Sequence, residues 1–263
     1  SMTGIDSFHT LAARASAADH DRYLCALFAP PAARAALFAL NLFNAEIART
    51  RETVSEPMLG QIRLQWWREV IDEIYQGRAR RHEIAEPLAE AIRAHKLTRG
   101  YFDRLIDARE GDLDEAPPES MAALEKYAEE SAAPLISLAL EVVDADANAL
   151  QELARHSGIG WALTGLMRAL PHHAAHGRIM LPDKDGRDVR AVAETARRHI
   201  DKARKLRRGA PRVVKRATLP AVLADAYLRR LVACGHDPYH PRAVIGPLRR
   251  QLLLSRAAFF GLS

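Results

Sequence analysis

Apolar residues in this chain recur with the spacing of helices from one end to the other, and no stretch alternates apolar and polar residues as a half-buried strand does. Ile62, Trp66, Val70 and Ile74 each lie one helical turn apart, which predicts a helix with a broad buried face. Prolines stand where such segments begin. The pattern predicts roughly eight to ten helices with short connections. They are expected to begin near residues 30, 55, 86, 98, 121, 147, 187, 220 and 241.

Prolines and glycines are spread too evenly to mark a domain boundary, so we expect one all-α domain over residues 1–263. Ser1 and Met2 look like the remnant of a cleaved tag. No apolar run approaches the ~18–20 residues that cross a bilayer, and the first residues do not resemble a signal peptide. Only two cysteines, Cys25 and Cys234, are present, which fits a reducing compartment. We therefore expect a cytoplasmic protein.

Positive charge is concentrated in one block. Residues Arg187 to Arg216 include twelve Lys or Arg against three Asp or Glu, although the whole chain carries a net charge of only +5. Such a block suits anionic lipid or an acidic protein surface, and the absence of aromatic residues makes nucleic acid an unlikely partner. The simpler alternative is a solvated helix face. The candidates for surface binding are Arg197, Arg198, Arg204, Lys205, Arg207 and Arg208.

Three segments together match a family pattern. They read ALFALNLFNAEIAR (Ala36–Arg49), RLQWWREVIDEIYQG (Arg63–Gly77) and LTGLMRALPHHAAHGRIMLP (Leu163–Pro182). In this order and spacing they resemble the squalene/phytoene synthase family of head-to-head prenyltransferases, over about residues 19–254. The resemblance implies an isoprenoid-synthase-like helical bundle with a central cavity.

Active members of that family carry two aspartate-rich motifs on facing helices, and their carboxylates hold the Mg²⁺ ions that bind prenyl diphosphate. In this chain the first pair of aspartate positions reads Ala45 and Arg49, and the second reads Ala169 and His173. Methyl groups, a guanidinium and an imidazole are poor or repelling partners for Mg²⁺. The residues at and beside these positions, which we expect to line the pocket, are Ala45, Glu46, Arg49, Ala162, Gly165, Ala169, His172 and His173.

A narrower resemblance is to the family branch of mitochondrial complex I assembly factors, over segments 43–77, 95–115 and 168–182. It implies a non-catalytic bacterial relative, without catalytic residues, metal or other cofactor, that binds a subunit or assembly protein of respiratory complex I. It also implies a place at the periphery of the inner membrane. The alternative is an active prenyl diphosphate transferase whose Mg²⁺ is held by altered ligands. Those ligands would be Glu46, His172, His173 and Asp103 or Asp107.

Residues close to these motifs have simpler interpretations. Pro171 is expected to end or kink its helix near Leu170, which would place His172 beyond the break. The acid-rich segment 103–114 is interpreted as a solvated face on which interleaved arginines pair with the acids.

Glu46 and Arg49 are expected to form an ion pair within one helix, unless Arg49 binds a phosphate or carboxylate ligand directly. Four aromatic residues are interpreted as core, with a tunnel for an isoprenoid or another lipid as the alternative. They are Phe38, Phe43, Trp66 and Trp67.

Overall fold

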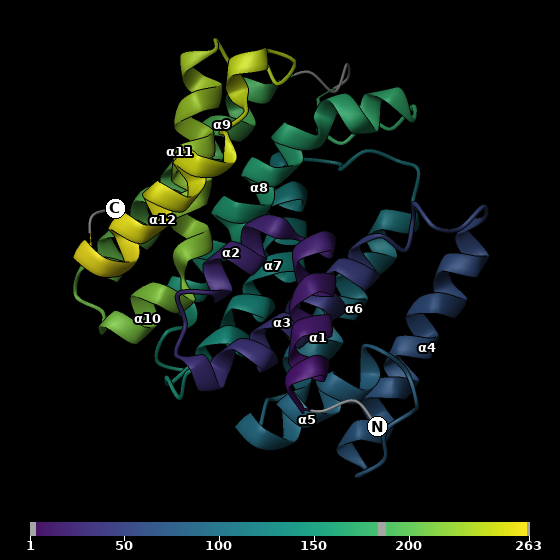
Figure 1. Ribbon diagram of the computed structural model, residues 1–263. Helices are drawn as coiled ribbons and strands as arrows, with labels where there is room; N and C mark the ends of the chain where they lie inside the picture. The colour runs from purple at the N-terminus through teal and green to yellow at the C-terminus, as the bar shows by residue number, and fades with distance from the viewer. Residues whose placement is uncertain (1–3, 184–187, 262–263) are drawn as a thin grey trace.

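Every element of regular secondary structure is a helix in the computed structural model, which describes residues 4–183 and 188–261 (Figure 1). The α-helices are α1 (Gly4–Ala18), α2 (His20–Ala26), α3 (Pro31–Ala48), α4 (Pro57–Tyr75), α5 (Ala85–His95), α6 (Arg99–Glu110), α7 (Met121–Val142), α8 (Gln151–Ala175), α9 (Val189–Arg208), α10 (Arg212–Ala217), α11 (Leu219–Ala233) and α12 (Pro247–Phe260). Two 3₁₀ helices, η1 (Gly111–Leu113) and η2 (Pro241–Ala243), complete the described ranges. The all-α prediction is confirmed. Ser1, Met2 and Arg187 lie outside the described residues.

Most helices begin where the sequence signals predict. Pro31 and Pro57 each occupy the first turn of a helix, where the missing N–H needs no partner, whereas the last helix begins at Pro247 and not near residue 241 as predicted. The side chain of Ser120 accepts a hydrogen bond from the backbone N–H of Ala123 at 3.1 Å and caps α7. The prediction missed α1 and α2, and it placed the start of α8 four residues too early.

Helix α8 continues through Pro171 to Ala175, so the expectation that the helix ends near Leu170 is wrong. Proline removes one backbone hydrogen bond. Here Met167 and Leu170, on the turn before it, are buried in the apolar cluster that α8 shares with α9, and this packing keeps the helix continuous. His172 therefore lies on the helix, with its ring centroid 4.5 Å from that of His176.

Helices α7, α8 and α9 pack against one another through small residues. A Cβ atom on Gly158 would lie 2.6 Å from the backbone nitrogen of Ala133 in α7. On the other side of α8, a Cβ atom on Gly160 would lie 2.7 Å from the side chain of Ile200 in α9. The two glycines thus allow α8 to approach both neighbours closely.

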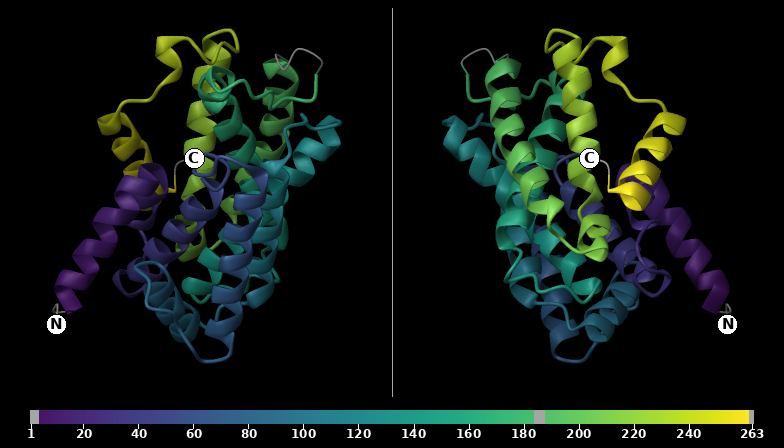
Figure 2. Two further views of the ribbon diagram at one scale, coloured as in Figure 1. Left: turned by 90° about the vertical axis from the view of Figure 1, so that its right-hand side faces the viewer. Right: turned by 90° about the vertical axis from the view of Figure 1, so that its left-hand side faces the viewer.

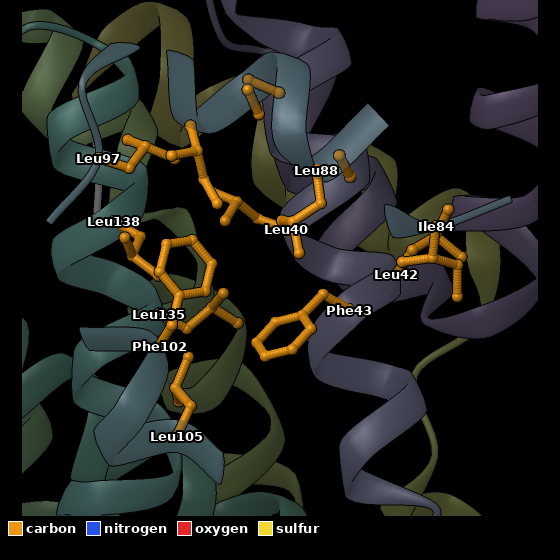
Figure 3. Packing of buried hydrophobic residues seen from close by; sticks show 14 of the residues in the cluster. Leu40, Leu42, Phe43, Ile84, Leu88, Leu97, Phe102, Leu105, Leu135 and Leu138 are labelled. Atoms are coloured by element: carbon orange, nitrogen blue, oxygen red, sulfur yellow. The ribbon is translucent and has the colours of Figure 1, made fainter. Parts of the chain in front are cut away.

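The largest apolar cluster contains residues of helices α3, α4, α5, α6 and α7. Figure 3 shows Phe43 and Phe102 among its leucines. The ring of Phe43 lies edge-on to Phe102 and Trp67, at centroid distances of 5.6 and 5.3 Å. Phe38 is also buried, whereas Trp66 is half-buried and Ile62 is exposed. The predicted stripe on α4 is therefore wrong at Ile62, its N-terminal member.

An apolar cavity beside this cluster measures about 30 Å³, which holds a water molecule or two. Leu37, Leu40 and Leu135 line it. It is too small for an isoprenoid chain, and the buried aromatic residues pack on one another rather than around a tunnel.

Figure 2 shows α1 and α12 at the periphery, on the same side of the bundle. Within the described ranges, no helix combines the length and the apolar character needed to cross a bilayer.

Candidate functional site

A polar cavity of about 450 Å³ lies between α3, α7 and α8 and is closed at its edges by the segments 49–52, 109–112 and 178–180. Its lining combines several arginines with small and apolar residues of α7 and α8. The lining residues are Asp19, Arg22, Asn44, Ala48, Arg49, Arg51, Glu52, Arg109, Asp112, Tyr127, Ser131, Ala132, Trp161, Ala162, Gly165, Leu166, Ala169, His173, Arg178 and Met180.

The structure brings five of the eight expected pocket residues to this cavity: Arg49, Ala162, Gly165, Ala169 and His173. They come from the end of α3 and from one face of α8, so the two helix positions that carry acids in active relatives do face a common space.

The other three expected residues lie outside the lining. Ala45 is buried, and Ala48, one turn further along α3, lines the cavity instead. Glu46 is held by the guanidinium of Arg63 on α4, and Arg49 is 3.8 Å from its second oxygen. The expected ion pair of Glu46 with Arg49 is therefore present, but its N–O distance is close to the limit of about 4 Å for an ion pair, and Arg63 is the nearer partner of Glu46.

The third of these residues, His172, lies in the last turn of α8. Its Nε2 atom is 3.3 Å from a carboxylate oxygen of Glu52. His172 is not part of the cavity lining, whereas His173 and Glu52 are.

Arg109 and Asp112 form a largely buried ion pair in the wall of the cavity. The Nη1 atom of Arg109 lies 3.3 Å from Asp112 Oδ2 and 3.1 Å from the hydroxyl of Tyr127. Tyr127 donates its own hydrogen bond to Asp112, and Arg178 donates to the Asp112 carbonyl at 3.1 Å. Burial and the neighbouring Asp112 raise the pKa of Tyr127, which keeps the phenol protonated and a donor.

Arg22 carries a buried charge on the opposite wall. Its Nε atom is 3.5 Å from Asp19, and its guanidinium stands 5.1 Å from the ring centre of Trp161. Burial lowers the pKa of Arg22 despite the attraction of Asp19, so its positive charge is only partly compensated.

Two guanidinium groups at the cavity also have unused donors. The buried Nε atoms of Arg51 and Arg109 have no hydrogen-bond partner in the described structure. Arg51 reaches Glu115 only at 3.6 Å through Nη2. Both Nε atoms are buried away from solvent and are exceptions to the rule that buried donors have partners.

Among the described residues that line the cavity, five arginines face three carboxylates. Each carboxylate already has a basic side chain beside it: Asp19 has Arg22, Glu52 has His172 and Asp112 has Arg109. Mg²⁺ needs several oxygen ligands and is repelled by guanidinium, so this donor set does not fit the metal cluster of the active enzymes.

The ligands of the alternative hypothesis are not gathered at one place. Asp103 lies 3.5 Å from Arg99, and Asp107 lies 2.9 Å from Arg68, both on the outer face of α6. Within the described ranges, no group of three or more His, Cys, Asp or Glu residues is arranged to hold a metal ion.

Sequence reasoning missed the inward-facing residues Arg22, Arg51, Arg109, Asp112 and Arg178. The interpretation of segment 103–114 as a solvated face holds for Asp103 and Asp107 but is wrong for Asp112, which is buried. The cause is η1, a tight turn after α6 that directs Asp112 inward. The resemblance of segment 95–115 to the assembly-factor branch was the one signal in the sequence that could have pointed to Asp112.

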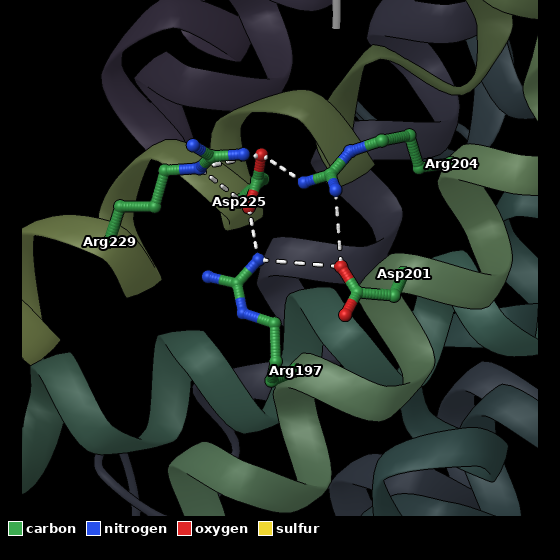
Figure 4. Close-up of polar contacts among 5 residues, drawn as sticks. All are labelled: Arg197, Asp201, Arg204, Asp225 and Arg229. Atoms are coloured by element: carbon green, nitrogen blue, oxygen red, sulfur yellow. Dashed lines mark hydrogen bonds and ion pairs between the residues drawn. The ribbon is translucent and has the colours of Figure 1, made fainter.

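The basic helix α9 is less available than the sequence predicts (Figure 4). Arg197 and Arg204 both bind Asp225 on α11, and Arg229 lies 3.1 Å from the same carboxylate. Burial opposes ionisation of Asp225, but the hydrogen bonds from these arginines outweigh it and lower its pKa.

Arg207 is wrong as a surface candidate, because its side chain is buried and donates to Thr218 Oγ1 at 3.0 Å. Burial lowers the pKa of Arg207 to about 10. The remaining candidates, Arg198, Lys205 and Arg208, are exposed.

The helices and the cavity between α3 and α8 define an all-helical bundle of the isoprenoid-synthase type. A solved structure of squalene synthase HpnC from Alicyclobacillus acidocaldarius superposes with a TM-score of 0.77, over 89% of this chain and 95% of that one, at 18% identity. This likeness shows the fold. The family model of squalene/phytoene synthase matches residues 15–188, and the chain belongs to that family.

Two curated relatives differ in their named roles. The bovine (Bos taurus) "NADH dehydrogenase (ubiquinone) complex I, assembly factor 6" is 31% identical over 243 residues, covering 85% of this chain and 73% of its own length. The presqualene diphosphate synthase of Rhodopseudomonas palustris is 29% identical over 208 residues, covering 69% of this chain and 72% of its own.

Proposed function

We propose that this chain acts as an assembly factor of respiratory complex I, as a binding or chaperone-type protein rather than as a prenyltransferase. Its likeness to assembly factor 6 across 85% of its length supports this role. Its partner would be a complex I subunit or another assembly protein. Its place would be the cytoplasmic face of the inner membrane, held at the periphery.

The composition of the cavity carries the proposal. The positions that supply carboxylates for Mg²⁺ in active relatives hold Ala45, Arg49, Ala169 and His173. Ionisation of a prenyl diphosphate depends on metal ions that stabilise the leaving group. A cavity in which arginines outnumber acids does not supply the oxygen ligands that those ions need.

The same arginines suit an anion that binds without a metal. Guanidinium groups donate two parallel hydrogen bonds to phosphate or carboxylate, and the cavity lining supplies several of them, Arg49 and Arg178 among them. Apolar lining from Trp161, Leu166 and Met180 stands beside them. A lipid or isoprenoid-like molecule with an anionic head therefore fits the cavity as a bound, unreacted ligand.

Catalysis can be tested by incubating the purified protein with farnesyl or geranylgeranyl diphosphate and Mg²⁺ and measuring released diphosphate. We expect no release above the protein-free rate. Turnover that is lost in Glu46→Ala would contradict the proposal and favour the enzyme with altered ligands.

The assembly role can be tested by deleting the gene in the source organism. Native gels and NADH:quinone oxidoreductase activity of the membranes should then show less assembled complex I, and the wild-type gene should restore it. Normal complex I levels after deletion would contradict the proposal.

A further inference from the structure

Helix α12 lies on the outside of the bundle and packs against α11, with contacts to α2 and α10 (Figures 1 and 2). Its inner face buries Leu254, Ala257 and Ala258. These residues join the apolar cluster formed with Leu223 and Tyr227 of α11, so the inner face accounts fully for the attachment of the helix.

The outer face of α12 is also apolar. Leu248, Leu252 and Phe259 are four and seven residues apart, which places them on one side of the helix. Their exposed fractions are 82%, 62% and 54%. Phe260, at 73%, lies at the edge of this ridge. A surface helix normally turns polar residues outward, so a second apolar stripe needs a partner.

Cations border this ridge. Arg249 and Arg256 of α12 are exposed. From α10, Arg212 donates to the carbonyl of Phe259 at 3.2 Å, and the guanidinium of Arg216 stands 5.5 Å from the ring centre of Phe259. In the described part of the chain, none of these four arginines forms an ion pair with a carboxylate.

Acidic residues are absent from both helices. Neither α10 nor α12 contains Asp or Glu, and the sequence after Asp237 has none. The nearby carboxylate of Asp21 in α2 is occupied by Arg250 at 2.6 Å. The surface is therefore cationic around an apolar centre, whereas on α9 Asp225 pairs with two of the predicted basic residues, Arg197 and Arg204.

We propose that this α12 face, the ridge of Leu248, Leu252 and Phe259 with its bordering arginines, docks onto an anionic lipid bilayer. An apolar ridge with flanking cations is the composition of helices that lie in the membrane interface. The ridge enters the boundary between headgroups and acyl chains, and the arginines reach the lipid phosphates.

Charge favours lipid over a protein partner as the occupant. A bilayer presents phosphates on every side of the ridge, which matches cations bordering it from two helices without any intervening acid. The inference rests on the membrane attachment proposed above, because it assigns that attachment to α12 instead of α9.

Flotation of the full-length protein with vesicles tests the docking directly. The wild type should bind vesicles that contain phosphatidylglycerol, bind pure phosphatidylcholine weakly, and lose binding as salt rises. Replacing two arginines by Arg249→Gln with Arg256→Gln should weaken binding about thirtyfold. Leu248→Ser with Leu252→Ser should weaken binding at high salt as well, because the apolar contribution is not screened.

The matched control is Arg198→Gln with Lys205→Gln, which removes two exposed charges from α9. This control should bind vesicles like the wild type, and all variants should keep the wild-type melting temperature. Equal losses in the α9 and α12 variants would overturn the assignment to α12. Failure of the wild type to bind anionic vesicles would overturn the docking, and it would leave the assembly role to be decided by the gene deletion.

Discussion

The guanidinium of Arg109 lies 3.3 Å from the carboxylate of Asp112, in the wall of the polar cavity. This pair consumes the most buried acid of the cavity, while the Nε atom of Arg109 stays without a partner. In the cavity lining, five arginines therefore stand against three carboxylates, each of which already has a basic side chain beside it. This is the opposite of what a magnesium-binding site requires.

The substitution Asp112→Asn should destabilise the protein, because it leaves the buried charge of Arg109 without its counterion. We expect the free energy of unfolding to fall by about 3 kcal/mol, measured by urea denaturation. Asp107→Asn, which removes an exposed partner of Arg68 from α6, should cost less than about 1 kcal/mol. Similar losses for the two variants would show that Asp112 is not a structural counterion.

Gly158→Ala should destabilise the contact between α7 and α8, because the added methyl group would meet the backbone of Ala133 at 2.6 Å. Overpacking lowers the free energy of unfolding by about 1–3 kcal/mol, and the better helix propensity of alanine offsets only about 1 kcal/mol of this loss. Gly165→Ala, on the same helix with no atom within 4 Å, should gain about 1 kcal/mol. Thermal melts should therefore shift in opposite directions, and a stabilised Gly158→Ala would refute the close approach.

The buried pair His156 and His199, whose Nδ1 atoms are 2.8 Å apart, should make stability depend on pH. His199 also meets Glu125 at 2.7 Å, and His156 meets Glu152 at 3.3 Å, with Arg155 and Lys202 nearby. Burial and then the neighbouring His199 lower the pKa of His156 in the folded protein.

Because the folded pKa of His156 lies below the ordinary value of 6.5, the folded state binds fewer protons than the unfolded state. The stability from this group is present above about pH 6.5 and is lost as the pH falls through the folded pKa. Between pH 7 and pH 5, the free energy of unfolding should therefore fall less for His156→Gln than for the wild type. Denaturation curves recorded at each pH measure this difference. An unchanged slope in His156→Gln would contradict the assignment.

The sequence predicted the helices well because helix signals are local. The prolines at the starts of α3 and α4 and the spacing of Trp66, Val70 and Ile74 need no knowledge of distant contacts. The missed α1 (Gly4–Ala18) has neither a proline at its start nor a buried stripe, since only Ala15 of its residues is buried.

The candidate site was less predictable because distant contacts determine it. Arg197 and Asp225 are 28 residues apart, so their pairing across α9 and α11 is invisible in the local pattern that made α9 look like a free basic surface. Asp112 looked like its exposed neighbours until η1 placed it beside Tyr127. The family pattern alone was enough to recognise that the acids are replaced, by Ala45, Arg49, Ala169 and His173. These positions also identified α3 and α8 as helices that face the cavity.

Titration of the purified protein with pyrophosphate, in EDTA and again in Mg²⁺, tests directly whether arginines rather than metal ions hold an anion in the cavity. We predict binding in EDTA, weaker binding in Mg²⁺ because the metal competes for pyrophosphate, and about a tenfold loss of affinity in Arg49→Gln but not in Arg198→Gln. Binding that appears only when Mg²⁺ is added would contradict this description of the cavity.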